Sequence, residues 1–113
     1  MHELSITQEI LDIAIAKAQE AASKKILQID LVIGDASSII DDCVQFCFDF
    51  VSKDTIAEGA RLNFQRIPIQ MKCRNCGNLF HPEKETWECP QCQKWEVDMI
   101  KGTEFYMESI EVD

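Results

Sequence analysis

Apolar residues in the first part of the chain recur with the period of a helix. Between Ser5 and about Lys24 they are spaced near 3.6 residues apart, which is typical of an amphipathic helix that covers a core with one face. Ser5 and Gln8 have the spacing of a capping box, which satisfies free N–H groups at a helix start. We therefore expect the helix to begin at Ser5 and to leave residues 1–3 as a short arm outside it.

The pattern then changes to the period of a strand and back to that of a helix. From Leu27 to Ile33 every second residue is apolar and Gly34 ends the run, which predicts a half-buried strand. A second helix is expected from Asp41 or Asp42, whose carboxylates suit a helix N-terminus. One apolar face of this helix is expected to be buried, because apolar residues follow at i, i+3, i+4 and i+7, namely Val44, Cys47, Phe48 and Val51.

Two further runs alternate in the second half of the chain. Residues 60–69 alternate up to Pro68, which has no backbone N–H and marks the end of a strand or an edge position. Residues 104–112 also predict a strand, but the apolar phase changes between Met107 and Ile110, where a β-bulge fits. The order of these elements predicts an α+β fold, with two helices on a small mixed three-stranded sheet.

Four cysteines between these last two strands define a separate insert. They form two C-x-x-C pairs, Cys73 with Cys76 and Cys89 with Cys92. A two-residue spacer lets both sulfurs of a pair reach one metal, and two such pairs complete a tetrahedral four-thiolate site of the kind zinc prefers. We therefore divide the chain into an α+β domain of residues 1–69 and 103–113 and a zinc-binding ribbon insert of residues 70–102.

Other interpretations of the cysteines stay open at this point. C-x-x-C-G and C-P-x-C also occur in iron knuckles of the rubredoxin type, although Gln93 stands where such a knuckle usually has glycine. His81 lies between the two pairs and can either replace a thiolate or remain solvated. Cys43 and Cys47 stand one helical turn apart among phenylalanines, so we expect them to be buried rather than to bind a metal.

Composition and charge exclude several classes of protein. A chain of 113 residues with 46% hydrophobic and 27% charged residues is sufficient for one ordered domain with a metal-stabilised insert. The net charge of −9 argues against nucleic acid and anionic membranes as partners, because both are bound through Lys and Arg. No apolar run is long enough to span a membrane, no signal-peptide pattern is present, and six cysteines suit metal binding in a reducing compartment. We expect a cytoplasmic protein.

The first three residues place several metal-binding nitrogens close together. The α-amino group of Met1, the backbone nitrogen of His2 and its imidazole can chelate one ion, and the backbone nitrogen of Glu3 can complete the set. Near-planar nitrogen coordination suits Ni(II) or Cu(II) better than zinc. Since His2 is too bulky for routine removal of the initiator methionine, Met1 is expected to be retained. Taken alone, this pattern does not distinguish a nickel site from a terminus without function.

Several short motifs occur in an order that resembles one known family. They are MHELS at the start, IG at residues 33 and 34, the FCFD and IAEGA segments, and the two C-x-x-C pairs. Over its whole length the chain resembles the HypA/HybF family of hydrogenase maturation nickel metallochaperones. The resemblance implies that His2 is the essential nickel ligand, that Glu3 contributes its backbone nitrogen, and that a separate structural zinc ion is held by four residues. These zinc ligands are Cys73, Cys76, Cys89 and Cys92.

The resemblance also implies a function and its partners. Nickel would be delivered to the large subunit of [NiFe]-hydrogenase together with a maturation GTPase, and urease maturation proteins are further candidate partners. Some members have an acidic residue near the start of the second helix that approaches the nickel, for which Asp41 and Asp42 are the candidates here. The chain has no G-x-x-x-x-G-K-[ST] loop and no plausible catalytic triad, so it is not expected to be an enzyme. The alternative function is a zinc-ribbon protein-interaction module that transfers no metal.

Overall fold

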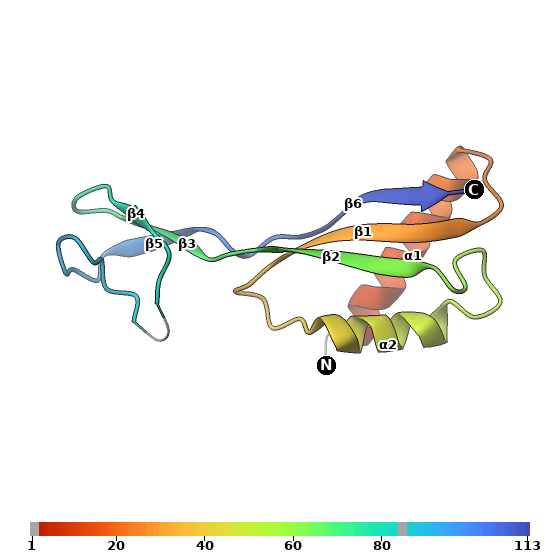
Figure 1. The fold of residues 1–113 in the computed structure, drawn as a ribbon, viewed down its shortest axis with the longest axis horizontal. Helices are drawn as coiled ribbons and strands as arrows, with labels where there is room; N and C mark the ends of the chain where they lie inside the picture. The colour runs from red at the N-terminus through yellow and green to blue at the C-terminus, as the bar shows by residue number, and fades with distance from the viewer. Residues whose placement is uncertain (1–2, 84–85) are drawn as a thin grey trace. The chain divides into compact units, whose positions relative to one another are not determined.

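The fold is an α+β arrangement of two helices and six strands in the residues that the structure, a computed structural model, describes: 3–83 and 86–113. In chain order the elements are α1 (Glu3–Glu20), β1 (Ile26–Gly34), α2 (Asp41–Val51), β2 (Arg61–Ile67), β3 (Gln70–Cys73), β4 (Leu79–Phe80), β5 (Val97–Lys101) and β6 (Phe105–Val112) (Figure 1). Neither of these helices is long and apolar enough to cross a membrane.

The chain divides into two compact units. The first takes in the residues up to Val32, then Ser38–Gln65 and Tyr106–Asp113, and therefore holds both helices. The second takes in Ile33–Ser37 and Arg66–Phe105, and therefore holds all four cysteines of the insert.

β1 is the central strand of a three-stranded sheet with the order β2-β1-β6. Asp35 donates its N–H to the carbonyl of Ile67 at 2.8 Å, so β1 and β2 end side by side and run parallel. Asp113 donates its N–H to the carbonyl of Lys25 at 3.1 Å, so the end of β6 meets the start of β1 and these strands are antiparallel. Parallel strands need a crossover, which the segment containing α2 supplies. The expected mixed three-stranded sheet with two helices is confirmed.

α1 begins at Glu3, two residues before the start that the capping box predicts. Ser5 therefore lies inside the first turn, and the prediction that Glu3 belongs to an arm outside the helix is wrong. A carboxylate in the first turn interacts favourably with the helix dipole, which supports the earlier start. The buried hydroxyl of Thr7 donates to the carbonyl of Glu3, one turn earlier. The spacing of Ser5 and Gln8 in the sequence does not reveal this earlier helix start.

β1 supplies much of the core of the first unit, although its burial does not follow the predicted alternation throughout. Ile29, Leu31 and Ile33 are buried as expected. Leu27, however, is 45% exposed while its neighbour Ile26 is fully buried, so the prediction for Leu27 is wrong. Ile26 donates its N–H to the carbonyl of Ile56 at 2.9 Å, which fixes the start of the strand against the loop after α2.

α2 begins at Asp41, one of the two starts that the sequence predicts, but its second apolar face is exposed. Val44 and Phe48 are fully buried, whereas Phe46 is 77% exposed. Cys43 is exposed and Cys47 is half-buried, so the prediction that both thiols are buried is wrong for Cys43 and holds in part for Cys47. Apolar residues lie on most sides of this helix. In a two-layer fold, however, only one side of a helix can pack against the core.

The later strands agree with the sequence at their ends. β2 stops at Ile67, directly before Pro68. In β6 two consecutive residues, Glu108 and Ser109, are exposed between the half-buried Met107 and Ile110, so the predicted change of phase is confirmed. The β-bulge itself stays a prediction.

The second unit contains an antiparallel sheet with the order β4-β3-β5. Met71 in the central strand pairs with Phe80 on one side and Met99 on the other, which places these three side chains on one face. In the same unit Gly34 is required by a close backbone approach. A Cβ at this position would lie 2.0 Å from the carbonyl oxygen of Gly102, so the strand can end here only with glycine.

Ser52, which follows α2, is expected to be replaceable by alanine with a gain in stability. Its side chain is fully buried, and within the described residues its hydroxyl has no hydrogen-bond partner. Because an unsatisfied buried hydroxyl costs about 1–3 kcal/mol, Ser52→Ala should raise the free energy of unfolding by about 1 kcal/mol. Urea unfolding followed by helical circular dichroism measures this change. Thr7→Val, which removes a satisfied hydroxyl, is the matched control and should be destabilising; a loss of stability in Ser52→Ala would contradict the argument.

Candidate metal centre

The four cysteines of the two C-x-x-C pairs converge on one point in the second unit. The Sγ atoms of Cys73, Cys76, Cys89 and Cys92 all lie within 4.8 Å of one another. The Sγ atoms of Cys73 and Cys92 are 3.5 Å apart, and those of Cys76 and Cys89 are 3.7 Å apart. Sulfurs about 2.3 Å from a tetrahedral zinc ion lie about 3.8 Å from each other. The cluster therefore has the dimensions of a single four-thiolate metal site.

Both cysteine pairs lie in turns with the same backbone geometry. The repeated bonds run from Gly77 N–H to the Cys73 carbonyl (2.9 Å), from Gln93 N–H to the Cys89 carbonyl (2.8 Å), from Cys73 N–H to the Asn78 carbonyl (2.9 Å) and from Cys89 N–H to the Lys94 carbonyl (2.9 Å). Gly77 and Gln93 occupy equivalent positions, with φ of 77° and 63°. Each turn thus requires a left-handed residue directly after its second cysteine, and the second turn uses glutamine for it.

Exchanging residues at these two left-handed positions should separate backbone strain from packing. No atom lies within 4 Å of a Cβ built at Gly77, so Gly77→Ala adds strain and no clash. A left-handed non-glycine residue costs roughly 1–2 kcal/mol, so Gly77→Ala should weaken zinc retention by about tenfold. Gln93→Gly relieves similar strain but gives the unfolded chain more freedom, so a much smaller change is expected. Competition with a chromogenic zinc chelator measures both; equal effects of the two substitutions would contradict this account.

Backbone amides stabilise the thiolate form of the first cysteine in each pair. A hydrogen bond from the Cys76 amide is the main cause that lowers the pKa of Cys73 below its usual value, against the effect of burial. Burial by itself raises the pKa of Cys89, but the Cys92 amide and further hydrogen bonds outweigh it and lower that pKa to about 6. The Asn78 side chain also donates to Cys89 Sγ at 3.8 Å. No sequence signal marks Asn78, because its role depends on the two turns facing each other.

The crowding of the four sulfurs opposes ionisation of the Cys76 thiol. The Asn78 amide lowers the pKa of Cys76, but burial and the neighbouring sulfurs, first that of Cys89, raise this pKa to about 12. Ionisation of the Cys76 thiol is therefore opposed unless a cation is shared among the sulfurs. A divalent metal supplies that charge and removes the remaining protons, so the donor set fits a thiophilic metal ion such as zinc.

The apolar core around this site is small. Met71 and Phe80 are its large buried side chains, and Cys73 and Cys89 complete the buried cluster. Three other large apolar side chains of the insert are exposed. These are Leu79 (53% exposed), Trp87 (41%) and Trp95 (64%). A metal is therefore needed to compensate for the small apolar area.

His81 lies outside the cluster of four sulfurs. Its Nδ1 is 2.8 Å from the carbonyl oxygen of Ile69 and donates to it, because a carbonyl can only accept. The side chain is otherwise exposed. The interpretation of His81 as a solvated residue agrees with this position, and the four thiolates need no fifth ligand.

The expected nickel ligands fall only in part on described residues. Met1 and His2 lie outside the part of the chain that the structure describes, so their role stays a prediction. Glu3 lines a hollow of about 370 Å³ between the start of α1 and α2. Asp42 lines the same hollow, whereas Asp41 does not belong to its lining. The approach of either carboxylate to the nickel stays a prediction.

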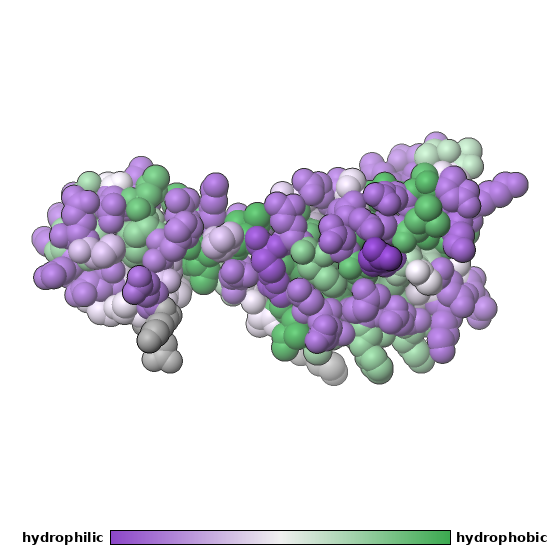
Figure 2. Space-filling model, in the orientation of Figure 1, coloured by the Kyte–Doolittle hydropathy of each residue, from purple (hydrophilic) through white to green (hydrophobic). Residues whose placement is uncertain are grey.

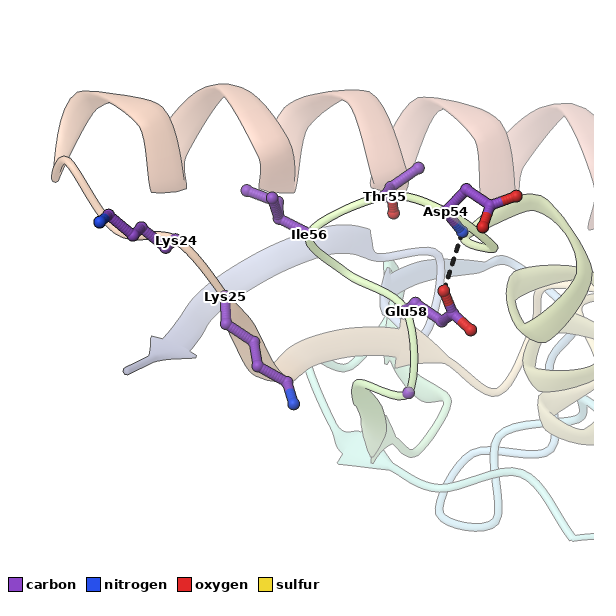
Figure 3. Close-up of a pocket in the computed structure, with 7 residues that line it drawn as sticks. Lys24, Lys25, Asp54, Thr55, Ile56 and Glu58 are labelled. Carbon is purple, nitrogen blue, oxygen red and sulfur yellow. Dashed lines mark hydrogen bonds between the residues drawn. The ribbon is translucent and has the colours of Figure 1, made fainter.

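A larger hollow, of about 670 Å³, lies where the two helices lead into their following strands (Figure 3). Lys24, Lys25 and Asp54 line it, and Glu58 accepts a hydrogen bond from the Asp54 N–H at 2.9 Å. Figure 3 shows the amines of both lysines and the carboxylate of Asp54 pointing away from one another. Because these charges do not converge, the hollow does not have the arrangement of a ligand site.

Comparison with known proteins places this geometry in a family. The family model described as "Hydrogenase/urease nickel incorporation, metallochaperone, hypA" matches residues 1–112. The chain belongs to the HypA family. The description of the family is that of a metallochaperone for nickel incorporation, and the resemblance found in the sequence is confirmed.

Close relatives span the full chain. The hydrogenase maturation factor HypA of Dehalococcoides mccartyi is 50% identical over 113 residues, which are 100% of this chain and 95% of the relative. HypA of Caldanaerobacter subterraneus subsp. tengcongensis is 42% identical over 114 residues, with complete coverage of both chains.

Solved structures of HypA show the same fold. A solution structure of HypA protein matches 99% of this chain and 96% of its own, with a TM-score of 0.75 and 21% identity. The solution structure of the nickel metallochaperone HypA from Helicobacter pylori matches 99% and 97%, with a TM-score of 0.66 and 20% identity.

Proposed function

We propose that the chain is a nickel carrier that binds Ni(II) at its N-terminus and delivers it for maturation of the [NiFe]-hydrogenase large subunit. The observation that carries this proposal is the HypA family match over residues 1–112, which includes the Met-His-Glu start and both C-x-x-C pairs. Zinc has a separate, structural role. Iron in the four-cysteine site, or an interaction module without metal transfer, are the alternatives.

The proposed nickel ligands are the Met1 amine, the His2 imidazole and the backbone nitrogens of His2 and Glu3. Glu3 is the first residue of α1, and the first four N–H groups of a helix have no acceptor within the helix. Its nitrogen is therefore not engaged in a helical hydrogen bond. Since nitrogen-rich, near-planar coordination suits Ni(II), this set is chemically matched to the cargo.

The proposed zinc site is closed and serves stability. Four thiolates at tetrahedral spacing leave no open coordination position for exchange or chemistry. Nickel and zinc would thus occupy different ligand types, nitrogen for the cargo and sulfur for the resident ion. The soft thiolate ligands favour zinc and the nitrogen ligands favour Ni(II), so each metal is expected at its own site.

The partners proposed are a maturation GTPase, which supplies the nucleotide hydrolysis that this sequence cannot, and the hydrogenase large subunit as acceptor. Urease maturation proteins are a second group of candidate partners, in line with the family description. A cytoplasmic location, where these proteins would be assembled, belongs to the same proposal. Nucleic acid and membranes are not proposed as partners, because the net charge is −9.

Nickel transfer can be measured directly. Zinc-loaded chain carrying Ni(II) is mixed with the purified GTPase and metal-free large subunit, and nickel in the re-isolated large subunit is quantified. We expect transfer from the wild type and a loss of nearly all of it with His2→Ala, while both still bind the GTPase. Binding of the GTPase without nickel transfer by the wild type would favour the interaction module instead.

A further inference from the structure

The solvent-facing side of α2 is an apolar stripe. Cys43, Phe46, Cys47 and Phe50 are spaced at i, i+3, i+4 and i+7, which places them on one face of the helix. The buried Val44 and Phe48 lie on a different face of the same helix, which packs into the core. Phe46 and Phe50 are 77% and 69% exposed, the highest fractions among the large apolar side chains described. Figure 2 shows apolar side chains projecting along the margin where α2 lies in Figure 1.

The stripe continues onto the first turns of α1. Leu4, 50% exposed, lines a hollow of about 370 Å³ with Cys43, Phe46 and Cys47. Leu4 also lines an adjoining hollow of about 700 Å³ together with Phe50. The two hollows flank one side chain, so the apolar surface is continuous across both helices of the first unit. A continuous apolar surface of this kind on a small domain typically marks a binding site.

The described residues around this surface carry mostly negative charge. Residues 3–16 of α1 and all of α2 contain no lysine or arginine and carry six carboxylates, namely Glu3, Glu9, Asp12, Asp41, Asp42 and Asp49. Of these, Glu3, Asp42 and Glu9 line the two hollows themselves. Among the residues that the structure describes, Lys53 brings a basic side chain to the edge, where its Nζ lies 5.9 Å from the centroid of the Phe50 ring.

We propose that this apolar surface of Leu4, Cys43, Phe46, Cys47 and Phe50 docks an amphipathic helix of a partner protein, whose apolar face is flanked by lysine or arginine. Apolar side chains spaced at i, i+3, i+4 and i+7 are the pattern by which helices pack into grooves. The carboxylates select the sign of the partner's flanks and orient it. The proposal deepens the proposed function, because a carrier must dock on its donor or acceptor, but it rests on that function only for the partner's identity.

A second copy of the chain fits this surface poorly. Self-association through the same face would bring two sets of carboxylates together in a chain whose net charge is already −9. Like charges placed opposite one another across an interface are destabilising. An anionic membrane is disfavoured by the same repulsion. A basic, amphipathic helix meets both the apolar stripe and the charges around it.

Binding of a defined probe tests the proposal without nickel. The probe is a fluorescent, helical Leu/Lys peptide of about 18 residues, long enough to hold a helix, with leucine at i, i+3, i+4 and i+7 and lysine on both flanks. Its dissociation constant for the zinc-loaded full chain is measured by fluorescence anisotropy. We expect Phe46→Ser/Phe50→Ser to weaken binding by about tenfold or more, because exposed aromatic anchors carry most of such an interface. Tyr106→Ser, which changes another exposed aromatic residue of the first unit, is the matched control and should bind as the wild type does.

Two further measurements make each outcome decisive. A peptide with glutamate in place of lysine should not bind, and Glu9→Gln/Asp49→Asn should weaken binding of the basic peptide and its salt dependence. Sedimentation should show the wild type as a monomer. Equal affinity of the wild type and the double Phe variant, or a wild-type dimer that this variant dissociates, would overturn the proposal. Because no step of the peptide-binding experiment uses nickel, its result can be interpreted even if nickel transfer fails.

Discussion

An extension of several residues before Met1, long enough to move the free amine out of reach of His2, is expected to damage Ni(II) binding as badly as His2→Ala does. An extension converts the α-amino group into an amide, and the substitution removes the imidazole, so each change deletes a ligand from the same fused chelate. Loss of a direct ligand should weaken nickel binding by more than the 10- to 100-fold that loss of an outer partner typically costs. Isothermal titration with Ni(II) measures this for the untagged, extended and His2→Ala proteins. All three must be free of copper, because copper outranks nickel at nitrogen ligands.

Zinc content is the internal control for that experiment. Both changes lie outside the second unit, and the four sulfurs that cluster within 4.8 Å are untouched, so zinc per chain should stay constant. Glu3→Ala is an informative comparison, because it keeps the backbone nitrogen and should retain most of the nickel affinity. If the extended protein binds nickel as tightly as the untagged one, the amine is not a ligand and the proposed site is wrong.

Removing the zinc ion is expected to unfold the ribbon while the helices remain. The buried core there has two large apolar side chains, Met71 and Phe80, whereas thiolate binding contributes on the order of 10 kcal/mol to small zinc units. Cys73→Ser or Cys92→Ser should therefore lose zinc and collapse the amide NMR dispersion of the insert. Signals of α1 and α2 should change little, since those helices pack in the first unit.

Cys43→Ser provides the matched control for the cysteine substitutions. Cys43 is exposed on α2 and is not part of the metal cluster, so its loss should leave zinc content and the ribbon spectrum unchanged. Metal analysis by mass spectrometry also separates zinc from iron, which has similar bond lengths to sulfur and would give a coloured protein. Unaltered zinc in both Cys73→Ser and Cys92→Ser would refute the assignment of the ligands.

The structural features that depend on residues close together in the sequence could be predicted from local sequence patterns. The i, i+3, i+4 spacing of α2, the alternation of β2 up to Pro68 and the end of β1 at Gly34 are properties of short segments, and the structure agrees with them. The four-cysteine cluster was equally predictable, because two residues between cysteines bring the sulfurs of each turn toward one metal. The family followed from the order of such motifs along the whole chain.

Other features depend on which surfaces meet, and the tertiary structure alone decided them. Periodicity placed Val44 and Phe48 on the expected buried face of α2, but only the structure shows that Phe46 and Phe50 face solvent. That Glu3 and Asp42 line one hollow depends on the packing of α1 against α2. A sequence records which residues are apolar, but burial is a property of pairs of surfaces, and too little core exists in a chain of 113 residues to bury them all.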